Sequence, residues 1–259
     1  MGNCFTEIAI QLEAGESVLF SGTPCQVSAI KSYLNQKKVR LDHFCSIDII
    51  CHGTPNKFLW EDYRRWLETR YGSDLVDFSF RYKNARWKLY PCMAEFVNGK
   101  KKINTQDIRL YTTLFFSGLV YRECCYSCKF ANLDREGDIT LGDFWGFENI
   151  MPSTSAKWNI KAQDGVSLVM VNSEKGRALW KDVLRNSEQC FYELCLSNAF
   201  IRYQHNLNAP TERPSNVDEF REDYKEYGFE YVAKKYANYS MRGKIRFILS
   251  RGYHEWIKR

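Results

Sequence analysis

Two stretches of this chain repeat one pattern: Val18-Leu19-Phe20-Ser21-Gly22-Thr23-Pro24-Cys25 and Ile47-Asp48-Ile49-Ile50-Cys51-His52-Gly53-Thr54-Pro55. Each runs a short apolar segment, typical of a buried strand, into a Gly-Thr-Pro turn that carries one cysteine. Helical periodicity follows each turn, over residues 26–34 and 56–71. The strand–helix–strand order favours a right-handed crossover and therefore parallel strands. We expect an α/β fold with a mostly parallel sheet and flanking helices.

The rest of the chain adds a hairpin and a helical tail. Alternation at 76–82, and the pair 90–97 and 101–104 around an Asn98-Gly99 turn, predict an inserted β-hairpin region. In the helix at 56–71 the expected apolar stripe consists of Phe58, Leu59, Tyr63, Trp66 and Leu67. The other expected elements are a helix at 108–119, strands at 138–145 and 166–171, a helix at 175–184, and a helical tail at 217–258 that turns basic at 241–259. We expect one domain at 1–205, followed by a loop and a basic helical tail at 206–259.

Composition limits the class of protein. The 259 residues are 44% hydrophobic and 26% charged, with a net charge of +6, which is ordinary for a globular chain with a sizeable core. No apolar run is long enough to span a membrane and no export signal is visible, so we expect a cytoplasmic protein without a transmembrane segment. In such a protein ten cysteines indicate metal or redox chemistry rather than disulfides.

Familiar catalytic and nucleic-acid motifs are missing. The sequence holds no Walker loop, no GxGxxG and no nucleophile elbow, so hydrolase and kinase functions have no support. A basic segment with interleaved aromatic residues at 80–87 is not accompanied by a nucleic-acid motif, and we expect no nucleic-acid partner. No residue can be assigned as catalytic from the sequence.

Four cysteines are the candidate metal ligands. Cys25 and Cys51 follow strands, and ligands of parallel sheets gather at the carboxyl ends of strands. Cys125 and Cys128 form a CxxC pair, which lets two sulfurs bind one centre, although Cys124 is an alternative to Cys125. Four thiolates can bind either a 4Fe–4S cluster or a structural zinc ion, so the spacing leaves both alternatives for the metal centre open.

A flat cofactor has candidate contacts at the same strand ends. Gly22 and Thr23 lie in the first turn, where glycine lets the backbone approach a bulky ligand. Trp145 follows the expected strand at 138–145 and either walls a cofactor or belongs to the core. We expect Gly22, Thr23 and Trp145 to adjoin a flavin if one binds.

Several motifs in a fixed order resemble the coenzyme F420 hydrogenase/dehydrogenase beta subunit family, chiefly its C-terminal domain. They are Ser21-Gly22-Thr23-Pro24-Cys25-Gln26, Cys51-His52-Gly53, the basic segment 80–87, Cys125-Tyr126-Ser127-Cys128, Arg135, Asp138-Ile139-Thr140-Leu141-Gly142-Asp143-Phe144-Trp145-Gly146 and Gly165-Val166-Ser167. The resemblance covers nearly the whole chain.

The resemblance implies an iron–sulfur oxidoreductase, linked to a flavin, that relays electrons through a 4Fe–4S cluster. It implies ligands at Cys25, Cys51, Cys125 and Cys128, which favours the cluster over zinc. It also implies a redox partner protein or a deazaflavin or flavin electron carrier.

Relatives usually carry an N-terminal ferredoxin-like segment and a Gly/Ser-rich region that helps to bind flavin, and neither is visible here. We therefore expect a fragment or a shortened homologue, in which FAD binding depends on the missing region. Bacterial relatives occur with polysaccharide biosynthesis genes. The alternative is a non-enzymatic, zinc-stabilised scaffold or partner module for that process.

Overall fold

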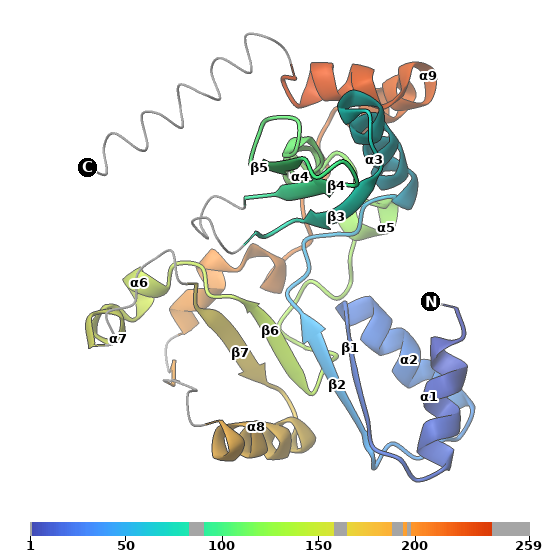
Figure 1. Ribbon diagram of the computed structural model, residues 1–259. Coiled ribbons are helices and arrows are strands. Elements are labelled where there is room, and N and C mark those ends of the chain that lie inside the picture. The colour runs from blue at the N-terminus through green and yellow to red at the C-terminus, as the bar shows by residue number, and fades with distance from the viewer. Residues whose placement is uncertain (1, 83–90, 158–164, 188–193, 196–197, 240–259) are drawn as a thin grey trace. The chain divides into compact units, whose positions relative to one another are not determined.

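The two repeated stretches form neighbouring parallel strands, as predicted. The computed structural model describes residues 2–82, 91–157, 165–187, 194–195 and 198–239. Strand β1 (Val18–Gly22) pairs in parallel with β2 (Phe44–Ile49), and β2 pairs in parallel with β6 (Ile139–Asp143). Strand β7 (Ser167–Val171) closes the order β1-β2-β6-β7 and runs antiparallel to β6. The expected α/β class with a mostly parallel sheet is confirmed (Figure 1).

The chain divides into two compact units. Unit 1 contains residues 1–52 and 127–210, and unit 2 contains residues 53–126 and 211–259. The four-stranded sheet belongs to unit 1, and a three-stranded sheet belongs to unit 2. The boundaries at 1–205 and 206–259 concern the family domain and its extension, and they remain a prediction.

Helices α1 (Cys4–Glu13) and α2 (Pro24–Gln36) supply one core of unit 1. Ile8 and Leu12 lie one helical turn apart on α1 and pack with Ile30 and Leu34 of α2 around Phe44. Helix α2 was expected, whereas α1 was not. The only sequence pattern that indicated α1 was the i, i+4 spacing of Ile8 and Leu12, and two apolar positions are too few to predict a helix.

Further helices of unit 1 follow the last two strands. Residues beyond β6 form α6 (Phe147–Ile150) and α7 (Pro152–Lys157), and those beyond β7 form α8 (Glu174–Asn186). Short 3-10 turns occur at Asn198–Tyr203 and His205–Leu207. Ser173 caps α8 by accepting a hydrogen bond from the Gly176 N–H at 3.0 Å.

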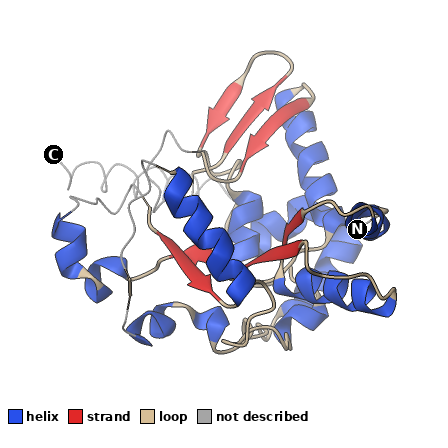
Figure 2. Ribbon diagram, turned by 90° about the horizontal axis from the view of Figure 1, so that it is seen from below, coloured by secondary structure: helices blue, strands red, loops and turns tan. Residues whose placement is uncertain are grey.

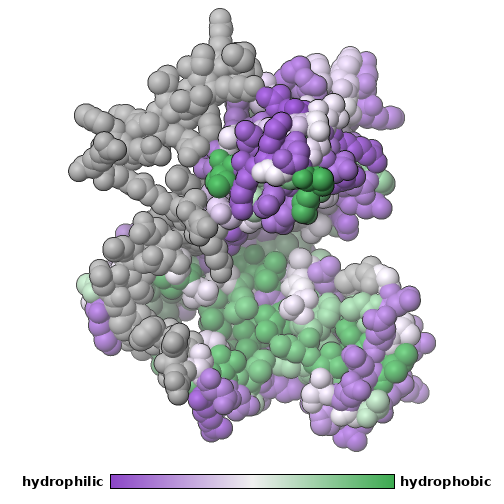
Figure 3. All heavy atoms as spheres, in the orientation of Figure 1, coloured by the Kyte–Doolittle hydropathy of each residue, from purple (hydrophilic) through white to green (hydrophobic). Residues whose placement is uncertain are grey.

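The sheet of unit 1 also carries exposed apolar side chains. Leu19, Ile49, Leu141 and Val171, one from each strand, are all more than a third exposed. Ile49 and Leu141 are partners in the parallel register, so they lie side by side on the sheet. Figure 3 shows a largely apolar surface over these strands.

Unit 2 is built on helix α3 (Lys57–Tyr71). Asn56 caps it by accepting from the Phe58 N–H at 3.1 Å, and Gly72 ends it with φ of +62°. Leu59, Tyr63 and Leu67 are buried, as predicted. The prediction for Phe58 was wrong, because its side chain is 54% exposed. Phe58 lies one residue before Leu59, which rotates it about 100° away from the buried stripe.

The predicted hairpin is confirmed in unit 2. Strands β4 (Met93–Phe96) and β5 (Lys101–Ile103) are antiparallel, and Gly99 takes φ of +77° in the turn between them. Strand β3 (Leu75–Ser79) pairs antiparallel with β4 to complete the sheet, drawn as red arrows in Figure 2. The basic segment 80–87 lies outside the described residues from position 83 onward.

Helices α4 (Leu110–Phe116), α5 (Glu123–Tyr126) and α9 (Val217–Tyr236) complete unit 2. Tyr63 lies at the centre of its core, with its ring 5.3 Å from that of Phe229 on α9. The helical C-terminal region is confirmed through α9, whereas the basic part at 241–259 lies outside the described residues.

A buried carboxylate holds the end of α3 to the segment before α4. Asp107 accepts hydrogen bonds from Tyr71 at 2.6 Å, Arg70 at 3.0 Å and Thr105 at 2.5 Å. Burial alone would raise the pKa of Asp107, but these hydrogen bonds outweigh it and lower that pKa.

Among the helices in the described part of the chain, none is long and apolar enough to cross a membrane.

Candidate metal and cofactor site

Cys25 lies in the first turn of α2. Thr23 is the N-cap residue of this helix, and its N–H donates to the Gln26 Oε1 at 2.9 Å within a capping box. The Thr23 hydroxyl lies 3.1 Å from the Cys25 Sγ, and the cysteine is exposed. A hydroxyl at this distance can donate a hydrogen bond to a thiolate. The Thr-Pro-Cys turn therefore presents an accessible sulfur with a fixed neighbouring donor.

Gly22 has a structural role beside this turn. A Cβ atom at position 22 would lie 3.0 Å from the Gln26 Oε1 and 3.2 Å from the Phe20 ring. The glycine therefore leaves the space in which Gln26 folds back to cap α2. The expectation that Gly22 and Thr23 adjoin a flavin remains a prediction.

Cys51 and His52 follow β2 in unit 1. Cys51 is partly buried, whereas the surface of His52 is exposed to solvent. Burial lowers the pKa of His52, while the carboxylate of Asp143 at the end of β6 acts in the opposite direction and His205 adds to the lowering. The net effect favours a neutral imidazole next to Cys51, so His52 brings no fixed positive charge to this strand end.

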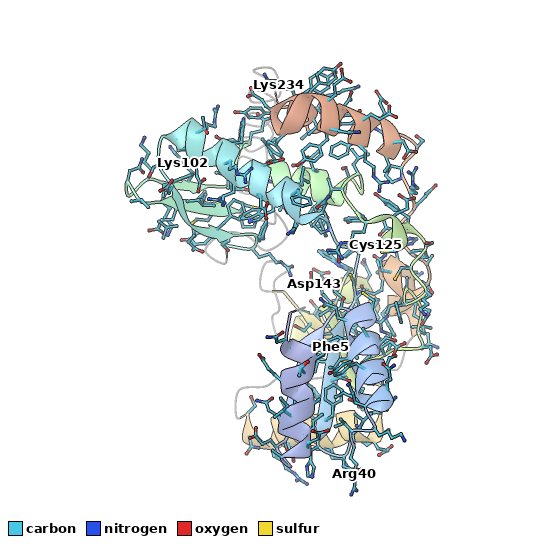
Figure 4. All side chains as sticks on the ribbon, turned by 90° about the vertical axis from the view of Figure 1, so that its right-hand side faces the viewer. Phe5, Arg40, Lys102, Cys125, Asp143 and Lys234 are labelled. Atoms are coloured by element: carbon cyan, nitrogen blue, oxygen red, sulfur yellow. The ribbon has the colours of Figure 1, made fainter. Side chains whose placement is uncertain are left out.

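Cys125, labelled in Figure 4, lies on α5 of unit 2. The second Gly-Thr-Pro turn, Gly53-Thr54-Pro55, contacts this segment. Pro55 forms an antiparallel bridge with Tyr121, and the Arg122 N–H donates to the Thr54 carbonyl at 3.0 Å. The Thr54 N–H in turn points at the Cys125 Sγ, 3.4 Å away. A backbone N–H directed at sulfur is the kind of contact that stabilises a thiolate ligand.

Cys124, the alternative to Cys125, is exposed on the same short helix. No hydrogen bond to its sulfur is described, whereas the Cys125 Sγ receives the Thr54 N–H. Cys125 therefore has the better environment for a ligand.

Cys128 begins the loop that leads to β6 in unit 1. The Ala131 N–H donates to the Cys128 carbonyl at 3.4 Å, which closes a turn directly after the CxxC pair. The structure places Cys125 in a helical turn and Cys128 two residues after that turn ends.

Trp145 lies two residues after the end of β6. Its N–H donates to the Asp143 carbonyl at 3.0 Å, and the residue is half-buried. Gly146 has φ of +74°, and a Cβ there would lie 2.6 Å from the Tyr203 ring. This tight turn explains the glycine that follows Trp145. That Trp145 forms one wall of a site for a flat cofactor remains a prediction.

Sequence reasoning missed two contributors to the cysteine segments. The Thr54 N–H reaches Cys125, and the side chain of Arg135 binds both the backbone of the Cys128 loop and the end of β2. The second Gly-Thr-Pro turn was a signal for Thr54. Arg135 belongs to the motifs that resemble the family, but its contacts had no sequence signal because its partner at Ile49 is distant in sequence.

The chemistry of the donor set fits a soft metal centre. The nine cysteines that the structure describes form no disulfide with one another, so their sulfurs are available as thiols or thiolates. Four thiolates suit iron–sulfur clusters and zinc alike. Within the described ranges, which include Cys25, Cys51, Cys125 and Cys128, no three His, Cys, Asp or Glu side chains are gathered as they would be around a metal ion, so the structure does not bring the predicted ligands together.

Comparison with protein families decides the kinship. Residues 15–192, more than half of the chain, match the family that comprises the C terminus of the coenzyme F420 hydrogenase/dehydrogenase beta subunit. The chain belongs to this family. The suspected resemblance is thereby confirmed, and the coarse class is an oxidoreductase domain of the F420 hydrogenase/dehydrogenase beta type. A comparison with curated proteins gives no match.

Proposed function

We propose that this domain of the beta type relays single electrons through a 4Fe–4S cluster bound by Cys25, Cys51, Cys125 and Cys128. The observation that carries the proposal is the Thr54 N–H directed at the Cys125 Sγ at 3.4 Å. A donor aimed at sulfur is expected where a thiolate carries negative charge in the working protein. Membership of a redox family adds independent support.

The residues of the chain would hold and tune the group. When bound, a 4Fe–4S cluster supplies one-electron steps, because its irons change oxidation state singly. The thiolates would bind iron, and the Thr23 hydroxyl and Thr54 N–H would withdraw charge from Cys25 and Cys125. Donors to cluster sulfurs raise the reduction potential, because they stabilise the more negative reduced state.

The proposal extends to a flavin and a partner. FAD would lie by Gly22, Thr23 and Trp145, and would connect two-electron hydride chemistry to single-electron transfer. The electron donor or acceptor would be a redox partner protein or a deazaflavin or flavin carrier. We place this function in the cytoplasm and in the domain at 1–205.

Metal analysis of anaerobically purified protein tests the proposal. We expect iron and acid-labile sulfide in equal amounts, little zinc, and a brown protein that absorbs broadly near ~400 nm because of thiolate-to-iron charge transfer. Replacement of both Cys51 and Cys128 by serine should remove the colour. A colourless protein with one zinc and no sulfide would instead support the zinc-stabilised scaffold.

Neighbouring cysteines provide a matched control. Cys125→Ser should lose iron, whereas Cys124→Ser, one position away on the same short helix, should retain it. Equal iron contents in these two variants would contradict the ligand assignment. Flavin released by acid from the same samples measures the FAD part of the proposal separately.

A further inference from the structure

Arg135 is the most completely bonded buried cation described in unit 1. Its side chain is 1% exposed, and it forms an ion pair at 3.2 Å with Asp48, which is fully buried. A guanidinium has five N–H donors in a rigid planar fork. Its hydrogen-bond acceptors are the Thr140 hydroxyl at 3.2 Å, the Phe130 and Asn132 carbonyls at 3.1 Å each and the Ile49 carbonyl at 3.1 Å. The Asp48 carboxylate adds the ion pair, so the guanidinium has polar partners from both the Cys128 loop and β2.

The Asp48 carboxylate also accepts hydrogen bonds from groups other than Arg135. Asp48 accepts the Gly137 N–H at 3.0 Å and the Thr140 hydroxyl at 2.5 Å. A buried ion pair is tolerated when hydrogen bonds compensate the desolvation of both charges. Removal of one partner leaves an uncompensated buried charge, which destabilises the folded protein. The Arg135–Asp48 pair is therefore a fixed point between β2 and β6.

This fixed point joins two cysteine segments. Phe130 and Asn132 lie two and four residues after Cys128, and Ile49 lies two residues before Cys51. One guanidinium thus binds the backbone of both segments, although Arg135 and Ile49 are 86 residues apart. A carbonyl bonded to this buried group has little freedom to move.

A third cysteine-bearing element reaches the same loop. Lys31 lies on α2, the helix whose first turn holds Cys25, and its Nζ donates to the Glu136 carbonyl. Glu136 is the residue after Arg135. The loop from Cys128 to β6 is therefore attached both to the end of β2 and to α2.

We infer that Arg135 is a positioning residue that holds the Cys128 loop against the end of β2, so that Cys51 and Cys128 are presented together to the metal centre. This inference rests on the proposed function. Lysine keeps the charge, but its three N–H donors lie on one nitrogen and cannot reproduce the planar five-donor fork that reaches the loop carbonyls, the Ile49 carbonyl and the Thr140 hydroxyl together.

The test compares Arg135→Lys with a matched control, Asp138→Asn. Asp138 is also a buried carboxylate between strands of unit 1, and it accepts the Ser46 N–H and hydroxyl at 2.8 Å each and the Ser173 hydroxyl at 2.6 Å. Asp138 is the last residue before β6, but its side-chain bonds go to Ser46 and Ser173 and not to the turn at 130–132 that follows Cys128. Both variants should lower the melting temperature, which sets a common scale for loss of stability.

The specific readout is the state of the cluster. In Arg135→Lys we expect release of iron to a chelator at least about tenfold faster than in wild type, with a matching loss of the visible absorption near ~400 nm. Asp138→Asn, at an equal loss of melting temperature, should keep the wild-type rate and spectrum. Equal release rates in the two variants would overturn the inference.

Thiol alkylation of the metal-free protein tests the positioning without a cluster. Arg135→Lys should raise the alkylation rates of Cys51 and Cys128, measured by mass spectrometry, more than that of Cys4 on α1, whereas Asp138→Asn should not. Unchanged rates in Arg135→Lys would overturn the inference. Absence of iron from the wild type would refute the proposed function, while this measurement still decides whether Arg135 orders the two segments.

A charge-neutral double variant keeps the test usable if Arg135→Lys does not fold. Arg135→Met combined with Asp48→Asn removes both buried charges together, which avoids leaving one of them unpaired. The double variant should show the same selective alkylation of Cys51 and Cys128. Wild-type alkylation rates in a folded double variant would contradict the positioning role.

Discussion

Replacement of Gly53 by alanine tests whether close contact in unit 2 brings the Gly-Thr-Pro turn to Cys125. Gly53 has φ of +147°, and a Cβ there would lie 2.6 Å from a carbon of the Tyr121 ring. Tyr121 is 4% exposed and its ring packs 5.1 Å from that of Phe115, so the ring has no free direction in which to move. The alanine must therefore push the turn away from Tyr121.

Two unfavourable contributions lower the stability of Gly53→Ala, one from the backbone and one from steric overlap. A non-glycine residue in this region of φ costs of order 1–3 kcal/mol. The overlap adds about 1–3 kcal/mol, the usual range for an overfilled core. The smaller conformational entropy of unfolded alanine offsets about 0.4–1 kcal/mol of this. We expect the free energy of unfolding to fall by about 3 kcal/mol, with loss of the Thr54 contact to Cys125.

Urea unfolding, followed by tryptophan fluorescence, measures this change against Gly99→Ala. Gly99 also lies in unit 2 and has φ of +77°, but nothing lies within 4 Å of its added Cβ. The control therefore carries the backbone cost alone, about 1 kcal/mol. Equal losses in the two variants would refute the steric argument, as would a Gly53→Ala value within ~0.5 kcal/mol of wild type.

Three further predictions concern Thr23, Asp107 and Gly176. Thr23→Val should lower the reduction potential of the proposed cluster and Thr23→Ser should preserve it, as measured by redox titration, because only serine keeps a hydroxyl near the Cys25 sulfur. For Asp107 the folded pKa is lowered, so its contribution to stability is present above the unfolded pKa and is lost as pH falls through the folded value. Asp107→Asn should therefore be most destabilising near pH 7, and its difference from wild type in thermal melts should begin to shrink only as the pH falls below the unfolded pKa of about 4; a difference that stays constant from pH 7 to below that pKa would contradict the sign. Gly176→Ala should destabilise unit 1 by about 1–3 kcal/mol in urea despite the better helix propensity of alanine, because the new Cβ would overlap the Asp138 carbonyl oxygen; a gain in stability would show that α8 can move away.

Local patterns predicted most of the elements. The twin strand–turn segments, the Asn98-Gly99 hairpin and the helix at 56–71 carry their periodicity and turn residues within a few positions, so neighbours in sequence suffice to define them. Phe58 was wrongly assigned to the buried stripe, because hydrophobicity alone does not distinguish residues 100° apart on a helix. Helix α1 was missed, because its two strongest apolar positions gain meaning only when they pack on α2.

The sequence by itself determined the candidate ligands and the kinship, because sulfur chemistry, CxxC spacing and the order of motifs are properties of residues along the chain. Only the tertiary structure decided which groups surround those sulfurs. The Thr54 N–H reaches a cysteine 71 residues away, and Arg135 binds a carbonyl 86 residues away. Such contacts form when packing brings distant backbone into a buried, low-dielectric setting, where a hydrogen-bond donor must find an acceptor. That requirement leaves no periodic mark on the sequence.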